Sequence, residues 1–179
     1  NDSLVGFKSL YLEPFPKANL RALDEIRNAD IIIFGPGGLY TSLIPLLLVE
    51  GVGKALRDTS AKKVFVANIM NKRKQTPGYQ VSHYLREVQR FIGKDIFSHI
   101  IVNKEKPAKD LLEKYEQEAE FITNDTTDDQ RFLVADILDN KEADYSKHDV
   151  IAHTRALIRH DAKKLAQVIM GVVHETDNL

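Results

Sequence analysis

The sequence predicts an α/β protein with a Rossmann-like, doubly wound and mostly parallel sheet that carries helices on both faces. Two observations support this fold class. Short continuous apolar runs recur along the chain, and such runs are typical of parallel strands covered on both faces. Segments with the periodicity of amphipathic helices alternate with these runs, as in repeated βαβ units. With 179 residues, of which 43% are hydrophobic, the chain can bury a core.

The first half of the chain shows this alternation most clearly. Pro14 and Pro16 are expected to end a first strand, because proline cannot donate a hydrogen bond to a neighbouring strand. Leu20, Leu23 and Ile26 share one face of a predicted helix. The elements expected here are a strand at Leu4–Leu12, a helix at Ala18–Asn28, a strand at Ile31–Phe34, a helix at Val52–Arg57 and a strand at Lys63–Asn68.

The second half is less regular beyond Glu118. The charged segment Asp139–His153 is expected to form a loop with one helix at most. Asp161 is placed to cap the last helix, since its carboxylate can accept from the first-turn amides. The elements expected here are a helix at Ser82–Phe91, a strand at His99–Val102, a helix at Ala108–Gln117, short strands at Phe121–Ile122 and Phe132–Val134, and a helix at Ala162–His174.

The composition excludes several classes of protein. The 25 Lys and Arg residues balance 26 Asp and Glu residues, so no global field exists to hold nucleic acid or an anionic membrane. The absence of cysteine excludes disulfides and thiolate zinc sites. The apolar stretch Leu43–Val49 is broken by Pro45 and is far shorter than the about 18 residues of a spanning helix. We therefore expect a soluble, cytoplasmic protein.

A glycine-rich segment directly follows the strand expected at Ile31–Phe34. In open α/β sheets, ligands bind at the carboxyl ends of the strands. Glycines allow the backbone to approach a ligand, and amides and hydroxyls at the start of a helical turn can bind phosphate or another anion. The residues of this candidate ligand-binding loop are Gly35, Pro36, Gly37, Gly38, Leu39, Tyr40, Thr41 and Ser42.

The better-known phosphate-binding motifs do not fit this loop. A G-x-G-x-x-G frame starting at Gly35 needs a glycine where Tyr40 stands, and a Walker frame around Lys54 lacks its first glycine and its final hydroxyl. A tight strand-to-helix turn, in which Thr41 or Ser42 only caps the helix, is therefore an alternative to a binding loop.

A long contiguous stretch runs from Ala29 to Pro45 and reads ADIIIFGPGGLYTSLIP. Together with Val64–Met70 and the triplet Arg159-His160-Asp161, it resembles the gluconeogenesis factor family, a sister of the 2-phospho-L-lactate transferases. The similarity covers nearly the whole chain but only the second half of the family. We therefore interpret residues 1–179 as the C-terminal part of a single α/β nucleotide-ligand-binding domain whose N-terminal half is absent here.

This resemblance implies a nucleotide-sugar ligand of the UDP-sugar type, or a related nucleotide. It assigns ligand contacts to Asn68 at the end of a buried strand, to Tyr115 on a helix and to Arg159 before the last helix. A guanidinium can bind phosphate with two parallel hydrogen bonds. The alternatives are a turn-forming role for Asn68, helix packing for Tyr115 and a surface ion pair for Arg159.

The sequence departs from the family pattern at several positions. Gly38 replaces a usual serine, Leu46 a common asparagine and Ala162 a common proline, and Asn71–Pro77 lacks the usual Gly-Glu-Thr. The basic run Lys72-Arg73-Lys74 within this last segment is either solvated or part of a lid over an anionic ligand.

The sequence supports no metal site. His148, His153 and His160 do not share one helical face, and we interpret them as solvated surface residues. No Ser-His-Asp set or carboxylate pair can be defended either, so the catalytic residues of any enzyme are unknown.

The resemblance implies a regulator of carbon metabolism, cell shape and cell-envelope growth rather than an enzyme. The alternative is a 2-phospho-L-lactate transferase, which moves a phospholactyl group to a deazaflavin in coenzyme biosynthesis and requires magnesium. A structural or interaction module is a third alternative. No nucleic acid or membrane partner is expected, and the sequence leaves a homo-oligomer open.

Overall fold

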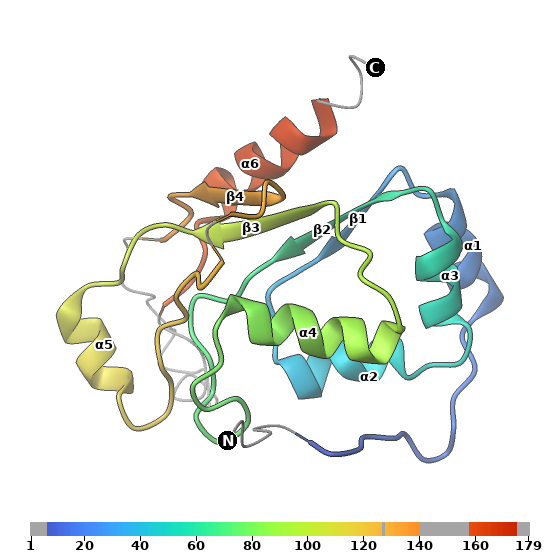
Figure 1. The fold of residues 1–179 in the computed structure, drawn as a ribbon, viewed down its shortest axis with the longest axis horizontal. Helices are drawn as coiled ribbons and strands as arrows, with labels where there is room; N and C mark the ends of the chain where they lie inside the picture. Colours follow the sequence, from blue (N-terminus) through green and yellow to red (C-terminus); the bar gives the residue numbers. More distant parts are fainter. Residues whose placement is uncertain (1–6, 127, 140–157, 175–179) are drawn as a thin grey trace, which may run out of the picture.

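The computed structural model describes residues 7–126, 128–139 and 158–174. At its centre is a parallel sheet of four strands in the order β1-β2-β3-β4. Figure 1 shows the carboxyl ends of β2 and β3 directed toward α5. The strands are β1 (Ile31–Phe34), β2 (Lys62–Val66), β3 (His99–Asn103) and β4 (Phe132–Ala135).

The helices cover both faces of this sheet. Figure 1 shows α2 and α4 on one side and α6 on the other. The helical elements are α1 (Leu20–Asn28), the π-helical turn η1 (Leu39–Leu43), α2 (Ile44–Leu47), α3 (Val52–Asp58), α4 (Val81–Ile92), α5 (Lys109–Tyr115) and α6 (Ala162–His174).

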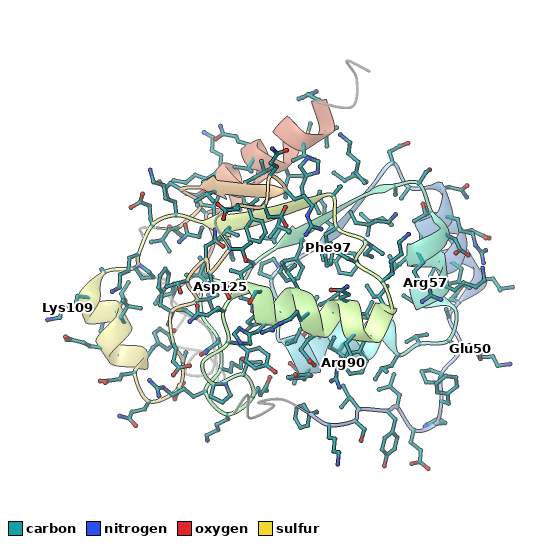
Figure 2. The ribbon with its side chains drawn as sticks, in the orientation of Figure 1. Glu50, Arg57, Arg90, Phe97, Lys109 and Asp125 are labelled. Carbon is teal, nitrogen blue, oxygen red and sulfur yellow. The ribbon has the colours of Figure 1, made fainter. Side chains whose placement is uncertain are left out.

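A separate apolar core lies on each face. On the α4 face, the Phe97 ring packs edge-on against Phe34, with ring centroids 4.9 Å apart, and lies 5.2 Å from Phe65. Figure 2 shows Phe97 between α4 and the strands. On the other face, Val172 of α6 packs in one cluster with Val64 of β2. The expected α/β class, a parallel sheet with helices on both faces, is confirmed.

The expected strands at Ile31–Phe34, Lys63–Asn68, His99–Val102 and Phe132–Val134 are confirmed with small shifts at their ends. The helices are confirmed in the same way, and two boundaries have a direct cause. The Asn19 side chain accepts from the amide of Arg21 at 2.9 Å and starts α1. Asp161 accepts from the amides of Lys163 and Lys164, each at 2.9 Å, and caps α6 as expected.

The strand expected at Leu4–Leu12 is wrong for its described part, because residues 7–12 pair with no strand. This segment runs instead along the α2 and α4 side of the molecule (Figure 1). The Phe7 ring packs edge-on on Tyr40, with centroids 4.8 Å apart, and the Phe7 carbonyl accepts from Arg90 at 3.0 Å. Tyr11 is 75% exposed, so the apolar residues of this segment do not mark a buried strand.

The strand expected at Phe121–Ile122 is also wrong, because Phe121 forms only an isolated antiparallel bridge with Met70. Of the charged segment Asp139–His153, all but Asp139 lies outside the described residues.

β1 is an outer strand, since among the described residues it pairs with β2 alone, and its Ile33 is 45% exposed. In the described part of the chain, no helix has both the length and the apolar character needed to cross a membrane.

Candidate functional site

A pocket of about 510 Å³ opens where β1 and β2 end. Its walls come from the segments that follow these two strands, from the end of α5 and the chain after it, and from the residues that lead into α6. Figure 1 places α5 beyond the carboxyl ends of the strands. The lining residues are Pro36, Gly37, Gly38, Asn68, Ile69, Met70, Asn71, Lys72, Tyr115, Glu118, Ala119, Ile158, Arg159 and His160.

The structure divides the predicted site residues into two sets. The set that lines the pocket is Pro36, Gly37, Gly38, Asn68, Tyr115 and Arg159. The set outside the lining is Gly35, Leu39, Tyr40, Thr41 and Ser42. Leu39 and Tyr40 are 2% and 5% exposed and belong to the core, so only their main chain can reach a ligand.

The main-chain amides of the glycine-rich loop are only partly free. The amide of Gly37 donates to Asn68 Oδ1 at 3.3 Å, and that of Ser42 donates to the carbonyl of Gly38 at 2.8 Å. The expectation that all amides from Gly37 to Ser42 await an anion is therefore corrected at both ends. Among the described residues, no acceptor lies within hydrogen-bond reach of the amides of Gly38, Leu39, Tyr40 and Thr41.

Asn68 ties the loop after β1 to the end of β2. Its Nδ2 donates to the carbonyl of Gly37 at 2.9 Å, and its Oδ1 accepts from the Gly37 amide at 3.3 Å. Both polar atoms of the side chain are thus used to hold Gly37 in place. Asn68 positions the glycine-rich loop, and its direct contact with a ligand stays a prediction.

Tyr40 attaches the same loop to α4. Its hydroxyl donates to Glu87 Oε2 on α4 at 2.8 Å and lies 3.0 Å from the hydroxyl of Tyr79. Burial raises the pKa of Tyr40 far above its ordinary value, and the hydrogen bonds to Tyr79 and Glu87 act in the same direction. The hydroxyl therefore stays protonated, and Tyr40 fastens the loop to α4 and to the chain before it.

Asn71 and Glu120 fix the opposite wall. Asn71, which is 2% exposed, donates to the Thr76 carbonyl at 2.9 Å and to Glu120 Oε2 at 2.6 Å, and it accepts from the Glu120 amide at 2.8 Å. Glu120 also accepts from the amide of Gly78 at 2.7 Å and pairs with Arg73 at 3.2 Å. These contacts, led by the hydrogen bond from Asn71, lower the pKa of Glu120.

This Asn71–Glu120 network was not predicted. Its members are separated by 49 residues, so no local spacing signals the contact. The only available sign in the sequence was a polar residue, Asn71, directly after the apolar pair Ile69-Met70 at the end of a buried segment.

His160 was expected to be a solvated surface residue, and this expectation is wrong. Its Nε2–H donates to the carbonyl of Ala67 at 3.1 Å, and the residue is half-buried in the pocket wall rather than solvated. The cause is long-range pairing, because His160 forms an antiparallel bridge with Leu138 and the Asp161 amide donates to the carbonyl of Ile137 at 2.8 Å. His148 and His153 lie outside the described residues.

His160 predicts a specific dependence of stability on pH. Burial lowers its pKa below the ordinary 6.5, against the opposing effect of the Ala67 carbonyl. Above pH 6.5 the imidazole is neutral in both the folded and the unfolded chain. Below pH 6.5 the unfolded chain takes up the proton first, so stability falls until the pH reaches the folded pKa.

His160→Gln is the variant that checks this. Its side-chain amide can still donate to Ala67, but it does not titrate. We expect urea unfolding to show that wild type loses stability relative to the variant as the pH falls from 7.5 to 5, because only wild type has an imidazole that resists protonation in the folded state. A constant difference over this range would contradict the assignment.

Tyr115 and Arg159 complete the pocket. Tyr115 is half-buried and packs beside an apolar cluster that contains Ile69 and Ile158, so it serves packing as well as lining the pocket. Arg159 is exposed, directly follows the buried Ile158 and lines the pocket as predicted. The cationic lining residues are Lys72 and Arg159, and the acidic one is Glu118.

Comparison with known proteins agrees with this architecture. The model of the family described as 2-phospho-L-lactate transferase CofD matches residues 5–141. A gluconeogenesis factor from Thermotoga maritima is 38% identical over 148 residues, which cover 82% of this chain and 45% of the relative. The gluconeogenesis factor of Bacillus subtilis is 30% identical over 164 residues, which cover 92% of this chain and 48% of the relative.

Solved structures show the same relation. A crystal structure of a Bacillus halodurans protein superposes with a TM-score of 0.77 and 29% identity, over 92% of this chain and 51% of that chain. A second one, titled as a member of the UPF0052 family, gives a TM-score of 0.76, with 30% identity, over 90% of this chain and 50% of that chain. The chain thus spans about half the length of the relatives that it matches. The relatives from Thermotoga maritima and Bacillus subtilis carry the name gluconeogenesis factor, and on the match over residues 5–141 the chain belongs to the 2-phospho-L-lactate transferase CofD family.

Proposed function

We propose that the protein binds a nucleotide-sugar of the UDP-sugar type, or a related nucleotide, in the pocket at the carboxyl ends of β1 and β2. The observation that carries this proposal is the convergence of two anion-binding features on one pocket. Gly38 contributes a main-chain amide that no acceptor among the described residues uses, and Arg159 contributes a guanidinium from the chain before α6. Both features suit phosphate oxygens.

The remaining lining suits the uncharged parts of such a ligand. Tyr115, Met70 and Ile158 offer aromatic and apolar surface to a base or a sugar face. The volume of about 510 Å³ falls within the range of about 300–1,000 Å³ that small-molecule sites occupy. Polar main-chain groups beside a partly apolar wall are the usual composition of such a site.

We further propose that ligand binding serves regulation of carbon metabolism and of cell-envelope growth. The names of the relatives from Thermotoga maritima and Bacillus subtilis, both gluconeogenesis factors, support the metabolic part of this role. Anion-binding groups around this pocket suit a regulator that responds to a nucleotide ligand.

Arg159→Ala tests the binding site directly. In the full-length protein, we expect the affinity for UDP-glucose to fall about tenfold, because a charged hydrogen-bonded contact of about 1.5–3 kcal/mol is lost. Isothermal titration calorimetry measures this change. Arg21→Ala removes an exposed arginine on α1 that lies outside the pocket lining, and it should leave the affinity unchanged. If the two variants bind equally well, Arg159 does not contact the ligand.

A second candidate is the transferase activity named by the family model that matches residues 5–141. In this case, the pocket would hold a phospholactyl donor, and a deazaflavin would accept the phosphoester group in the presence of magnesium. Incubation of the full-length protein with donor, acceptor and magnesium, followed by mass analysis of the deazaflavin, separates the two proposals. A product heavier by the phospholactyl group supports the enzyme, and an unchanged acceptor supports the regulator.

A further inference from the structure

Lys72 differs from its two basic neighbours in the structure. Arg73 pairs with Glu120 at 3.2 Å, and Lys74 is exposed outside the pocket lining. Lys72 alone of the three lines the pocket. In the part of the chain that the structure describes, no carboxylate lies within 4.0 Å of its ammonium group. The basic run is therefore one structural cation, one solvated cation and one cation at the ligand site.

The backbone that carries Lys72 is held in a fixed turn. The carbonyl of Lys72 accepts from the amides of Gln75 and Thr76, each at 2.8 Å. Thr76 is buried, and the preceding residue is Asn71 with its three side-chain hydrogen bonds. A turn with buried polar anchors on both sides is not a freely moving lid. The position of the Lys72 main chain is set before any ligand arrives.

Two anion-binding features thus follow two neighbouring parallel strands. The free amides around Gly38 come after β1, and Lys72 comes after β2. Asn68 links the two segments through its pair of hydrogen bonds with Gly37. A ligand with two phosphate groups can use the amides for one and the ammonium group for the other.

The charge of the lining favours such an anion. Among the described residues of the lining, Lys72 and Arg159 oppose the carboxylate of Glu118, which leaves one net positive charge in this set. An unpaired ammonium group at a pocket gains most from a ligand that brings its own negative charge.

We infer that Lys72 is a specificity-determining residue that contacts the second phosphate group, so that the pocket selects a nucleoside diphosphate group over a nucleoside monophosphate. This inference rests on the proposed nucleotide binding. It adds that the second phosphate group of the ligand is recognised and that Lys72 is the residue that binds it. Arg159 and the loop amides serve both ligands, whereas Lys72 serves the diphosphate.

The test compares UDP and UMP as probes in calorimetry with the full-length protein. In Lys72→Ala, we expect the affinity for UDP to fall about tenfold and that for UMP to change less than about twofold, because only the diphosphate loses a charged contact. Lys72→Arg should keep the preference for UDP. Lys74→Ala removes the same charge from the same turn and should match wild type for both probes.

A second readout is the dependence on salt. A lost ionic contact makes binding of UDP less sensitive to ionic strength, so the affinities of wild type and Lys72→Ala should approach each other between 50 and 500 mM salt, as expected from a Debye length that shortens from about 14 to about 4 Å. Wild type and Lys74→Ala should respond alike.

Each other result overturns the inference. If Lys72→Ala lowers the affinities for UDP and UMP equally, Lys72 supports the pocket wall and does not bind the second phosphate group. If Lys72→Ala and Lys74→Ala have equal effects, only the general charge of the turn matters. If Lys72→Ala binds UDP as wild type does, the inference fails while the proposed function stands. If wild type binds neither probe nor UDP-glucose, the proposed function fails and the inference fails with it.

Discussion

Replacing Tyr40 by alanine is expected to lower the free energy of unfolding by about 3–5 kcal/mol, because a buried aromatic ring is removed. The ring packs edge-on against Phe7, and its hydroxyl bonds to Glu87 and lies beside Tyr79. The variant therefore loses packing, two polar contacts and the attachment of the glycine-rich loop to α4. Urea unfolding followed by circular dichroism measures the change.

Two matched variants divide this effect. Tyr40→Phe keeps the ring and removes the hydroxyl, so a loss of about 1–2 kcal/mol is expected from the unsatisfied neighbours. Tyr11→Ala removes an exposed tyrosine and should shift stability by no more than about 0.5 kcal/mol. A loss for Tyr40→Ala as small as that for Tyr11→Ala would show that the loop is not anchored through Tyr40.

Asn71→Ala is expected to cost about 3 kcal/mol of stability, because it removes three hydrogen bonds from a buried side chain and leaves the Thr76 carbonyl and the Glu120 amide without their partner. The wall that carries Lys72 should loosen as well. We therefore expect weaker UDP binding by this variant at temperatures where it is still fully folded, measured by calorimetry.

Asn71→Asp separates shape from charge at this position. It keeps the size of the side chain but sets a carboxylate next to Glu120, whose Oε2 lies 2.6 Å from the Asn71 amide nitrogen. Repulsion should make this variant no more stable than Asn71→Ala at neutral pH, with partial recovery on acidification. Lys74→Ala changes an exposed residue three positions after Asn71 and should unfold as wild type does. Wild-type stability in Asn71→Ala would show that the network does not hold the wall.

The fold could be predicted from the sequence where the signal is local. The apolar run Ile31–Phe34 became β1, and the carboxylate of Asp161 before an apolar periodic segment correctly marked the start of α6. The strand expected at Leu4–Leu12 was wrong for residues 7–12, because apolar composition shows only that a segment can bury surface. It does not show whether a neighbouring strand offers hydrogen bonds to that segment.

The site was predictable to the extent that it follows from a strand end. The glycines after β1 and Asn68 after β2 were expected at this edge of the sheet and both line the pocket, but the hydrogen bonds from Asn68 to Gly37 were not predicted. The structure places the side chain of Tyr40 in the core, which the sequence could not reveal because an aromatic residue in a loop suits packing and ligand stacking equally. The burial of His160 was missed because the bridge to Leu138 depends on a return of the chain that no periodicity encodes.

The outer position of β1 has a consequence for how the protein behaves in solution. On the side away from β2, the peptide groups of β1 pair with no strand among the described residues, and Ile33, which is 45% exposed, adds apolar surface beside them. A flat, apolar sheet edge can pair with a strand of another chain, which is the first step of aggregation. Whatever covers this edge of four residues therefore limits strand pairing between chains.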